Sequence, residues 1–277
     1  MIIRRSIQLT SLLCFWLFTR LTYADYANVN GISMYYEVHG NPHGTPVVML
    51  HGGYDDSDMW AIETGMLAPF YRIIEIDSRG HGRTTDSAAP ITYELMADDT
   101  LKLLDAIGIS TAHFIGWSDG AVIASQIAIG HPERVNQLVL FGAAFQADAY
   151  VDLFTAALNQ PALFNAFIDS TFGLKYHLTS PTPDYWPTFR DKLLTLWKSP
   201  CYFSGQPTTM CLAPLQAINA PTLVVAGEQE IIKRSHTQAV AANIPNARLK
   251  FVPLASHFLP KLRPVLSGYI ILNFLNN

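Results

Sequence analysis

The chain has 277 residues, of which 49% are hydrophobic and 14% are charged. This balance suits one well-buried domain and excludes a disordered or low-complexity protein. The formal net charge of -4 offers no basic surface for nucleic acid, so we expect no nucleic-acid partner.

The first 24 residues have the pattern of a secretory signal peptide. Two arginines, at positions 4 and 5, precede an apolar run over Leu9–Phe18, and small residues stand at positions 22 and 24. The apolar run is too short to span a bilayer. We therefore predict cleavage after Ala24, export to the periplasm or the medium, and no lasting membrane insertion of the mature chain. Arg20 is unusually close to the cleavage site, which leaves an uncleaved anchor as the alternative.

A mature chain that begins at Asp25 holds two cysteines, Cys201 and Cys211. In an oxidising compartment, a pair this close in sequence can form a disulfide that closes a short loop. The alternative is two separate buried thiols. Both remain open, because the sequence does not give the distance between the two Cα atoms.

The first half of the mature chain predicts strands that alternate with helices. Ile32–Val38 alternates and is rich in β-branched and aromatic residues, as a strand is. Pro46–Leu50 is a continuous apolar run, typical of a strand buried on both faces, and Tyr71–Ile76 is a further strand. Helices are expected over Trp60–Leu67 and over Thr92–Ile107, with Thr92 as the N-cap.

The stretch from Gly116 to Gly120 reads G-x-S-x-G, between an apolar run that predicts a strand and a small-residue pattern that predicts a helix over Ala121–Ile129. A strand that turns sharply into a helix leaves its pivot residue strained and exposed, and flanking glycines make room for the tight approach. The pivot here is Ser118. It is the candidate nucleophile, and a plain glycine-bounded turn is the alternative.

A segment without strand patterns interrupts the alternation from about residue 142 to residue 220. It is rich in aromatic residues and punctuated by prolines, which predicts several short helices. We expect these helices to form a lid over the carboxyl edge of the sheet. An ordinary helical extension packed elsewhere is the alternative.

The alternation resumes after residue 220. Strands are expected over Pro221–Ala226 and Ala247–Val252, and helices over Arg234–Asn243 and Pro264–Leu275. With the strand Val135–Phe141 before the interruption, this order predicts a parallel sheet with right-handed crossovers.

A serine hydroxyl needs a base, and the base needs an orienting acid. His257 follows the last predicted strand in a short loop, where it can reach the edge of the sheet that holds Ser118. Glu228 and Glu230 both stand at the end of the preceding strand, and either carboxylate can hold the imidazole tautomer. The chain order would be serine, acid, histidine.

An oxyanion needs two backbone N–H donors. One should belong to Asp119, at the amino end of the helix after Ser118, where the helix dipole also favours negative charge. The other should come from the loop over residues 51–54, in which Gly53 lets the backbone approach a ligand without a Cβ atom in the way.

Five motifs stand in order along the chain. They are His51-Gly52-Gly53, the run from Asp77 to Thr84, Gly116-Trp117-Ser118-Asp119-Gly120, Gly227-Glu228-Gln229-Glu230 and Ser256-His257-Phe258. Together they resemble the α/β-hydrolase fold superfamily over about residues 30–275.

The resemblance implies an eight-stranded, mostly parallel sheet flanked by helices, formed by residues 25–142 and 221–277. It also implies a helical cap inserted after the sixth strand, over residues 143–220. By the family's pattern the acid is Glu230, although the family usually has Asp there, and Glu228 is the second choice. The first oxyanion amide is that of Gly53, with Tyr54 as the alternative. The run from Asp77 to Thr84 is mainly architectural in this family.

The serine sets the chain apart from the dehalogenases and epoxide hydrolases of this fold, which use an aspartate nucleophile. The elbow looks like that of carboxylesterases and amino-acid-ester hydrolases. In that light, Asp119, Asp55 and Asp56 are candidates to attract a substrate ammonium group, and solvated or salt-bridged carboxylates are the alternative.

The sequence thus predicts an exported serine hydrolase that cleaves a carboxylic ester of a small substrate through Ser118, His257 and Glu230. Cysteine and histidine show no zinc spacing and no phosphate or dinucleotide motif is present, so we expect no metal and no cofactor. The alternatives are a small-ligand binding protein on a hydrolase scaffold, or a cofactor-free haloperoxidase-like, lactonase or amidase activity.

Overall fold

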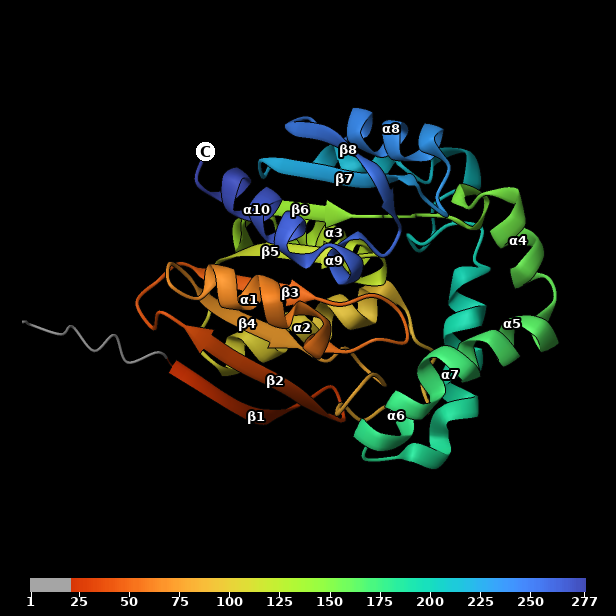
Figure 1. Ribbon diagram of the computed structural model, residues 1–277, viewed down its shortest axis with the longest axis horizontal. Helices are drawn as coiled ribbons and strands as arrows, with labels where there is room; N and C mark the ends of the chain where they lie inside the picture. Colours follow the sequence, from red (N-terminus) through yellow and green to blue (C-terminus); the bar gives the residue numbers. More distant parts are fainter. Residues whose placement is uncertain (1–20) are drawn as a thin grey trace, which may run out of the picture.

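A computed structural model describes residues 21–277 of the chain (Figure 1). Its centre is one sheet of eight strands in the order β1-β2-β4-β3-β5-β6-β7-β8. The strands are β1 (Leu21–Val29), β2 (Ile32–Gly40), β3 (Pro46–Leu50), β4 (Arg72–Ile76), β5 (Ala112–Trp117), β6 (Val135–Phe141), β7 (Thr222–Gln229) and β8 (Ala247–Ser256). β2 is antiparallel to both of its neighbours, and all other pairs are parallel. The predicted α/β fold with a mostly parallel eight-stranded sheet is confirmed.

Sequence reasoning missed strand β1. The strand forms a hairpin with β2 through Asn30 and Gly31, both with positive φ (45° and 75°). An Asn-Gly pair is the strongest short-range hairpin signal, because both central residues of such a turn need this backbone conformation. The predicted signal peptide lies mostly outside the described residues. Its last residues, 21–24, belong to β1, so cleavage after Ala24 would leave Asp25–Val29 to pair with β2.

Helices cover both faces of the sheet (Figure 1). On one face α1 (Ala61–Leu67) packs against α10 (Pro264–Leu275), with the short α9 (Leu259–Leu262) beside it. The other face carries α2 (Tyr93–Ala106), α3 (Asp119–Gly130) and α8 (Arg234–Asn243). Each face has its own buried apolar cluster, which explains why the central strands are apolar on both sides.

Four further helices lie beyond the arrowheads of the parallel strands, on the right of Figure 1. They are α4 (Asp152–Leu158), α5 (Pro161–Ile168), α6 (Leu174–Thr179) and α7 (Trp186–Trp197), and a π-helical turn over Asp169–Gly173 joins α5 to α6. We call these four helices the cap. After the cap the chain returns to the core, where a 3₁₀ turn over Ala213–Ala217 contacts α3 and α8.

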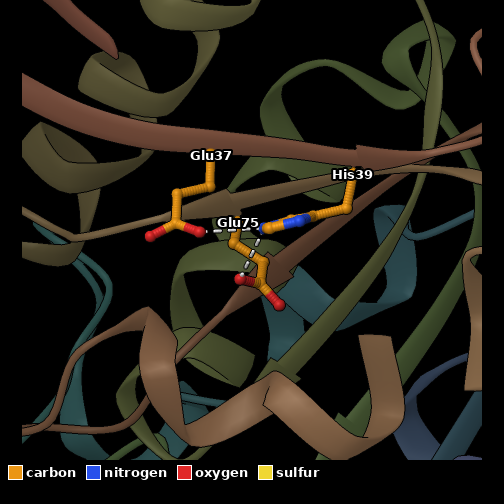
Figure 2. Close-up of side chains that lie close together, drawn as sticks. All are labelled: Glu37, His39 and Glu75. Atoms are coloured by element: carbon orange, nitrogen blue, oxygen red, sulfur yellow. Dashed lines mark hydrogen bonds and ion pairs between the residues drawn. The ribbon is translucent and has the colours of Figure 1, made fainter. Parts of the chain in front are cut away.

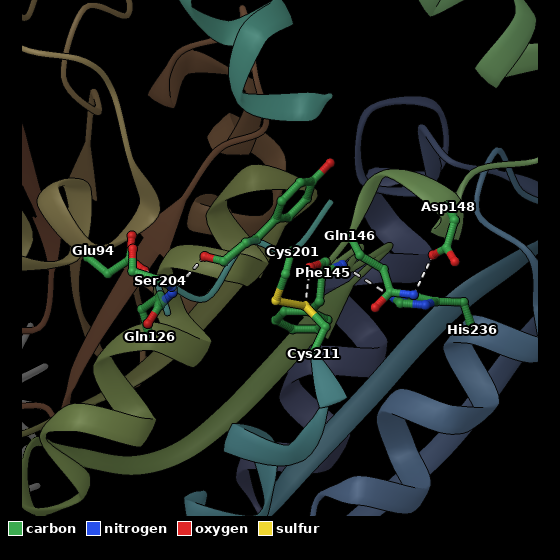
Figure 3. The surroundings of a disulfide bond; sticks show 10 residues. Glu94, Gln126, Phe145, Gln146, Asp148, Cys201, Ser204, Cys211 and His236 are labelled. Carbon is green, nitrogen blue, oxygen red and sulfur yellow. Dashed lines mark hydrogen bonds between the residues drawn. A yellow bond between two sulfur atoms is a disulfide. The ribbon is translucent and has the colours of Figure 1, made fainter. Parts of the chain in front are cut away.

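A disulfide joins Cys201 to Cys211 just after α7, with the two Cα atoms 5.6 Å apart (Figure 3). The structure therefore shows a disulfide at these cysteines rather than two separate buried thiols. Within residues 21–277, every helix is too short or too polar to cross a bilayer.

Candidate active site

Ser118 occupies the sharp turn between β5 and α3. Its backbone has φ 55° and ψ -118°, a conformation that non-glycine residues adopt only under constraint. The constraint is tight packing on both sides. A Cβ atom on Gly116 would lie 2.3 Å from the Gly120 carbonyl oxygen, and one on Gly120 would lie 2.2 Å from that of Leu50. The G-x-S-x-G spacing is therefore required by the backbone contacts that hold Ser118 in place.

Three side chains from the ends of three strands meet at this turn. His257 follows β8, and its Nε2 lies 3.0 Å from Ser118 Oγ. Its Nδ1 lies 2.5 Å from Oε1 of Glu230, which follows β7. The Trp117 indole N–H donates to the His257 carbonyl oxygen at 2.7 Å and fixes the loop that carries the histidine. The predicted serine, histidine and Glu230 thus lie in contact with one another.

Glu228, the second candidate for the acid, lies elsewhere. It is part of β7 and is exposed, whereas Glu230 is half-buried and faces the histidine. The carboxylate of Glu230 also accepts the Ile231 backbone N–H at 2.9 Å, which orients it. A glycine at position 142 leaves room for this pair, because a Cβ atom there would lie 2.9 Å from the His257 ring.

The expected oxyanion donors lie close to Ser118. Asp119 is the first residue of α3, so its N–H has no acceptor within the helix. Gly53 lines the same cavity as Ser118. A Cβ atom on Gly53 would lie 2.4 Å from the Trp197 ring and 2.6 Å from Asp119 Oδ2, so only glycine fits there. Tyr54, the alternative, also lines the cavity, and its hydroxyl donates to the Arg190 carbonyl oxygen at 2.8 Å.

The carboxylate of Asp119 is buried, and Asp119 is not among the residues that line the cavity. It accepts the Tyr93 hydroxyl at 2.8 Å and the Trp197 indole N–H at 2.9 Å. Burial raises the pKa of this carboxyl above its ordinary value. Neither Tyr93 nor Trp197 was singled out from the sequence, and only the folded chain brings them to Asp119. These bonds link α2 and the cap helix α7 to the residue next to Ser118.

Asp55 and Asp56, the other candidates for an ammonium site, are already paired. Asp55 contacts Lys261 at 2.5 Å and Lys175 at 3.1 Å, and Lys175 also contacts Asp56 at 2.5 Å. The structure therefore agrees with the salt-bridged alternative for both carboxylates. With Asp119 bound to Tyr93 and Trp197, all three candidates have partners within the protein.

The run from Asp77 to Thr84 holds turns together, as expected. Asp77 accepts bonds from Ser57 and Arg83, and Arg79 pairs with the buried Asp99 at 2.7 Å. His81 is fully enclosed, and burial lowers its pKa to about 3. A ring with so low a pKa stays neutral near neutral pH, which agrees with an architectural role for His81.

A small apolar cavity lies above Ser118 and His257, with a volume of about 60 Å³. Half of its lining residues come from the segment between β6 and β7, which includes the cap, and the other half come from the core. Gly53, Tyr54, Trp117, Ser118 and His257 line the cavity on the core side. The other lining residues are Tyr150, Phe154, Phe164, Phe167, Ile168, Phe172, Trp197, Ile231 and Phe258. Aromatic rings thus surround the space next to the serine, which suits an apolar group on a ligand.

Comparisons with known proteins agree with this fold. The family model described as alpha/beta hydrolase fold matches residues 45–264. A protein of Caulobacter sp. (strain K31) that carries the name carbamate hydrolase RutD is 26% identical over 264 residues, which cover 88% of this chain and 96% of that protein.

Two solved structures illustrate the similarity. Est816, described as an N-acyl homoserine lactone degrading enzyme, superposes with a TM-score of 0.65 and 26% identity, over 90% of this chain and 99% of its own. The enol-lactonase from Burkholderia xenovorans LB400 gives a TM-score of 0.70 at 23% identity, over 91% of this chain and all of its own (100%). At that identity, the second likeness concerns the fold alone.

Proposed function

The chain belongs to the alpha/beta hydrolase fold family, and from this premise we propose that it is a serine hydrolase that cleaves a carboxylic ester of a small substrate. Hydrolysis is the chemistry that the family and its relatives support. The ester bond is our own choice among the bonds that such a site can cleave, since the relatives' names also cover a carbamate and lactones.

One observation carries the proposal: Ser118, His257 and Glu230 form an unbroken series of contacts at the floor of an apolar cavity. His257 Nε2 is within reach of the serine proton, at 3.0 Å from Oγ. Glu230 accepts the Nδ1–H, which selects the tautomer with a free Nε2 and stabilises the imidazolium that forms.

The reaction would begin with attack of Ser118 Oγ on the ester carbonyl carbon, as His257 takes the hydroxyl proton. The carbonyl oxygen becomes an oxyanion, which we assign to the backbone N–H groups of Gly53 and Asp119. Such donors contribute about 10²–10³ in rate each, because they are fixed in place before the charge develops.

Collapse of the tetrahedral intermediate breaks the bond to the leaving alcohol, and His257 returns the proton to that alcohol. The acyl group is now bound as an ester of Ser118. Water enters, His257 removes its proton, and the carboxylic acid leaves with Ser118 restored. The protein's own groups supply every proton transfer, so the proposal requires no cofactor.

The proposed substrate has an apolar acyl group that fits between the aromatic rings of the cap. A volume of about 60 Å³ is well below the roughly 150 Å³ of a cavity that binds benzene. We therefore favour a short acyl group in this closed arrangement.

A fluorophosphonate probe tests the mechanism on the purified protein, since it labels only an activated serine. We expect one adduct, located on Ser118 by peptide mapping, with labelling lost in Ser118→Ala and His257→Ala. Ester hydrolysis should fall in parallel while both variants stay folded. Retained hydrolysis in Ser118→Ala would overturn the mechanism. Absence of labelling and turnover in folded protein, with stoichiometric binding of a small apolar ligand, would favour a binding protein instead.

We also propose that the protein is exported. The N-terminal pattern supports this, and so does the Cys201–Cys211 disulfide, because such bonds persist mainly in oxidising compartments. N-terminal sequencing of the extracytoplasmic protein should begin at Asp25. A chain that starts at Met1 and stays with the membrane fraction would favour the uncleaved anchor.

A further inference from the structure

Two glutamates face each other across strands β2 and β4. Glu37 of β2 pairs directly with Glu75 of β4, and His39 follows Glu37 on the same face (Figure 2). Like charges directly opposite one another destabilise a sheet. Glu75 is only 4% exposed, whereas the side chain of Glu37 is 21% exposed, so water screens this pair only in part. The arrangement therefore calls for a cation between the two carboxylates.

His39 alone satisfies only one of the two carboxylates well. Its Nε2 lies 2.9 Å from Glu37 Oε2 and 3.4 Å from Glu75 Oε2. A ring nitrogen carries one hydrogen, which can point at only one oxygen. Within residues 21–277, no other basic side chain lies within 4.0 Å of the Glu75 carboxylate. The Oε2 atoms of Glu37 and Glu75 therefore share a single nitrogen, with the longer of the two distances at Glu75.

Neighbouring hydroxyl groups aim both carboxylates at the same point. Tyr35 donates its hydroxyl to Oε1 of Glu37 at 2.6 Å, and Thr64 of helix α1 donates to Oε1 of Glu75. In each case the other oxygen, Oε2, is left turned toward His39. Outer hydrogen bonds of this kind orient the ligands in metal sites.

We propose that Glu37, His39 and Glu75 form a binding site for a divalent transition-metal cation, with zinc as the best match. Imidazole and carboxylate are ordinary zinc ligands, at about 2.1 Å from the metal. In a tetrahedral site, ligand atoms at that distance are about 3.4 Å apart. The observed separations of 2.9 and 3.4 Å from Nε2 require only small shifts, and all three ligand atoms lie within 4.8 Å of one another.

Space for a fourth ligand is present. The three side chains line a surface hollow of about 380 Å³, in which Gly65 of α1 and Ala68, the residue just after this helix, present little bulk. Water can therefore complete the coordination. Arg83 lies 3.9 Å from Oε1 of Glu37, the oxygen that accepts the Tyr35 hydroxyl rather than the one that faces His39.

The site would act on stability rather than on catalysis. A bound ion would link β2 to β4 and relieve the repulsion between Glu37 and Glu75, in a part of the chain that contributes no residue to the Ser118 cavity. Ligands that bind the folded state alone raise the melting temperature. We therefore expect zinc to raise Tm and to leave ester hydrolysis unchanged, so the proposal does not depend on the enzymatic one.

The test uses the whole protein after treatment with a chelator. Calorimetric titration with Zn²⁺ should give one site per chain, and Co²⁺ in its place should show the visible absorption bands of tetrahedral coordination. Glu75→Gln and His39→Ala should each abolish both the binding and the rise in Tm. Tyr35→Phe, which removes only the outer hydrogen bond to Glu37, should weaken binding about tenfold or more.

His131→Ala is the matched control. His131 lies 3.4 Å from Glu133 on the surface, and this histidine–glutamate pair offers a metal two ligands instead of three. It should keep the wild-type affinity. The proposal is overturned if the wild type takes up no Zn²⁺, or if His39→Ala and Glu75→Gln bind as tightly as the wild type. Because Gln keeps the shape of Glu, Glu75→Gln remains informative even where His39→Ala does not fold.

Discussion

Trp197, the last residue of the cap helix α7, donates its indole N–H to the carboxylate of Asp119, the residue that follows Ser118. This bond joins the cap to the turn that carries the proposed nucleophile. Asp119 is only 4% exposed, so each hydrogen bond to its carboxylate contributes more to stability than a bond at the surface would.

Trp197→Phe keeps the ring and removes the N–H. We expect the free energy of unfolding to fall by about 2 kcal/mol, since a buried charged acceptor loses a donor, and kcat/KM for ester hydrolysis to fall as well. Trp186→Phe is the control, because its indole bonds Asp169, which is 45% exposed and can turn to water. Urea denaturation and steady-state kinetics check both. Equal losses in the two variants would contradict a special role for the bond to Asp119.

Glu230→Gln should lower kcat by about 10⁴ with the fold intact, because an amide no longer enforces the tautomer in which His257 Nε2 accepts the serine proton. Glu228→Gln should leave kcat unchanged, since this side chain is exposed and lies away from the histidine. Single-turnover assays with an activated ester measure the difference. A large loss in Glu228→Gln would show that the acid has been assigned to the wrong glutamate.

The acyl chain length that the enzyme prefers should depend on the side chains of the cap. In the wild type we expect acetyl esters to exceed octanoyl esters in kcat/KM, because the cavity is small. Phe154→Ala removes a ring from its wall and should shift this ratio toward longer chains by about tenfold or more. Leu153→Ala is the control on the same helix, with a side chain that is 83% exposed. An unchanged ratio in Phe154→Ala would mean that the acyl group binds elsewhere.

Gly120→Ala should destabilise the protein by at least about 2 kcal/mol, since its Cβ would lie 2.2 Å from the Leu50 carbonyl oxygen and force the strand and helix apart. Gly130→Ala, near the other end of α3, meets nothing within 4 Å. The Gly130→Ala variant should have a free energy of unfolding about 0.5–1 kcal/mol higher than the wild type, because alanine lowers the entropy of the unfolded chain. Thermal denaturation compares the two, and a stable Gly120→Ala would refute the packing account of the turn.

His236 should make the protein sensitive to acid. Burial lowers the pKa of His236 to about 4, and its Nε2 accepts the Phe145 backbone N–H at 3.3 Å (Figure 3). Below the ordinary histidine pKa of about 6.5, the unfolded chain takes up a proton that the folded chain refuses. Stability is therefore lost as pH falls from about 6.5 to about 4, by up to about 3 kcal/mol.

His236→Gln removes this titration and should flatten the pH dependence over that range, as followed by urea denaturation at each pH. His131→Gln is the control, since His131 is exposed and half of its side-chain surface meets solvent (53%). A wild-type profile that His236→Gln leaves as steep as before would assign the acid sensitivity to other groups.

The strands of the sheet and the residues that follow them could be predicted from the sequence, because short local patterns determine both. Apolar runs fixed the central strands, and the G-x-S-x-G turn, the loop with His257 and the turn with Glu230 each follow a strand. Strand β1 was missed because its residues overlap the predicted signal peptide, although Asn30 and Gly31 mark the hairpin.

Contacts between distant segments escaped prediction. The bond from Trp197 to Asp119 and the meeting of His39 with Glu75 depend on how the cap settles and on strand register, which no local pattern specifies. The choice between Glu230 and Glu228 rested on family resemblance, since both stand at the same strand end. The cysteine pairing likewise needed the Cα separation that folding sets.

The cap leaves the core after β6 and returns before β7, while Ser118, Glu230 and His257 follow or end the core strands β5, β7 and β8. The proposed catalytic residues and the cap helices thus come from separate stretches of the chain. If the proposed function holds, we expect that changes in the cap alter part of the wall next to the acyl group while Ser118, His257 and Glu230 keep their positions. The bond between Trp197 and Asp119 limits such changes, because a cap without this donor would leave the buried carboxylate with the Tyr93 hydroxyl of α2 as its side-chain partner.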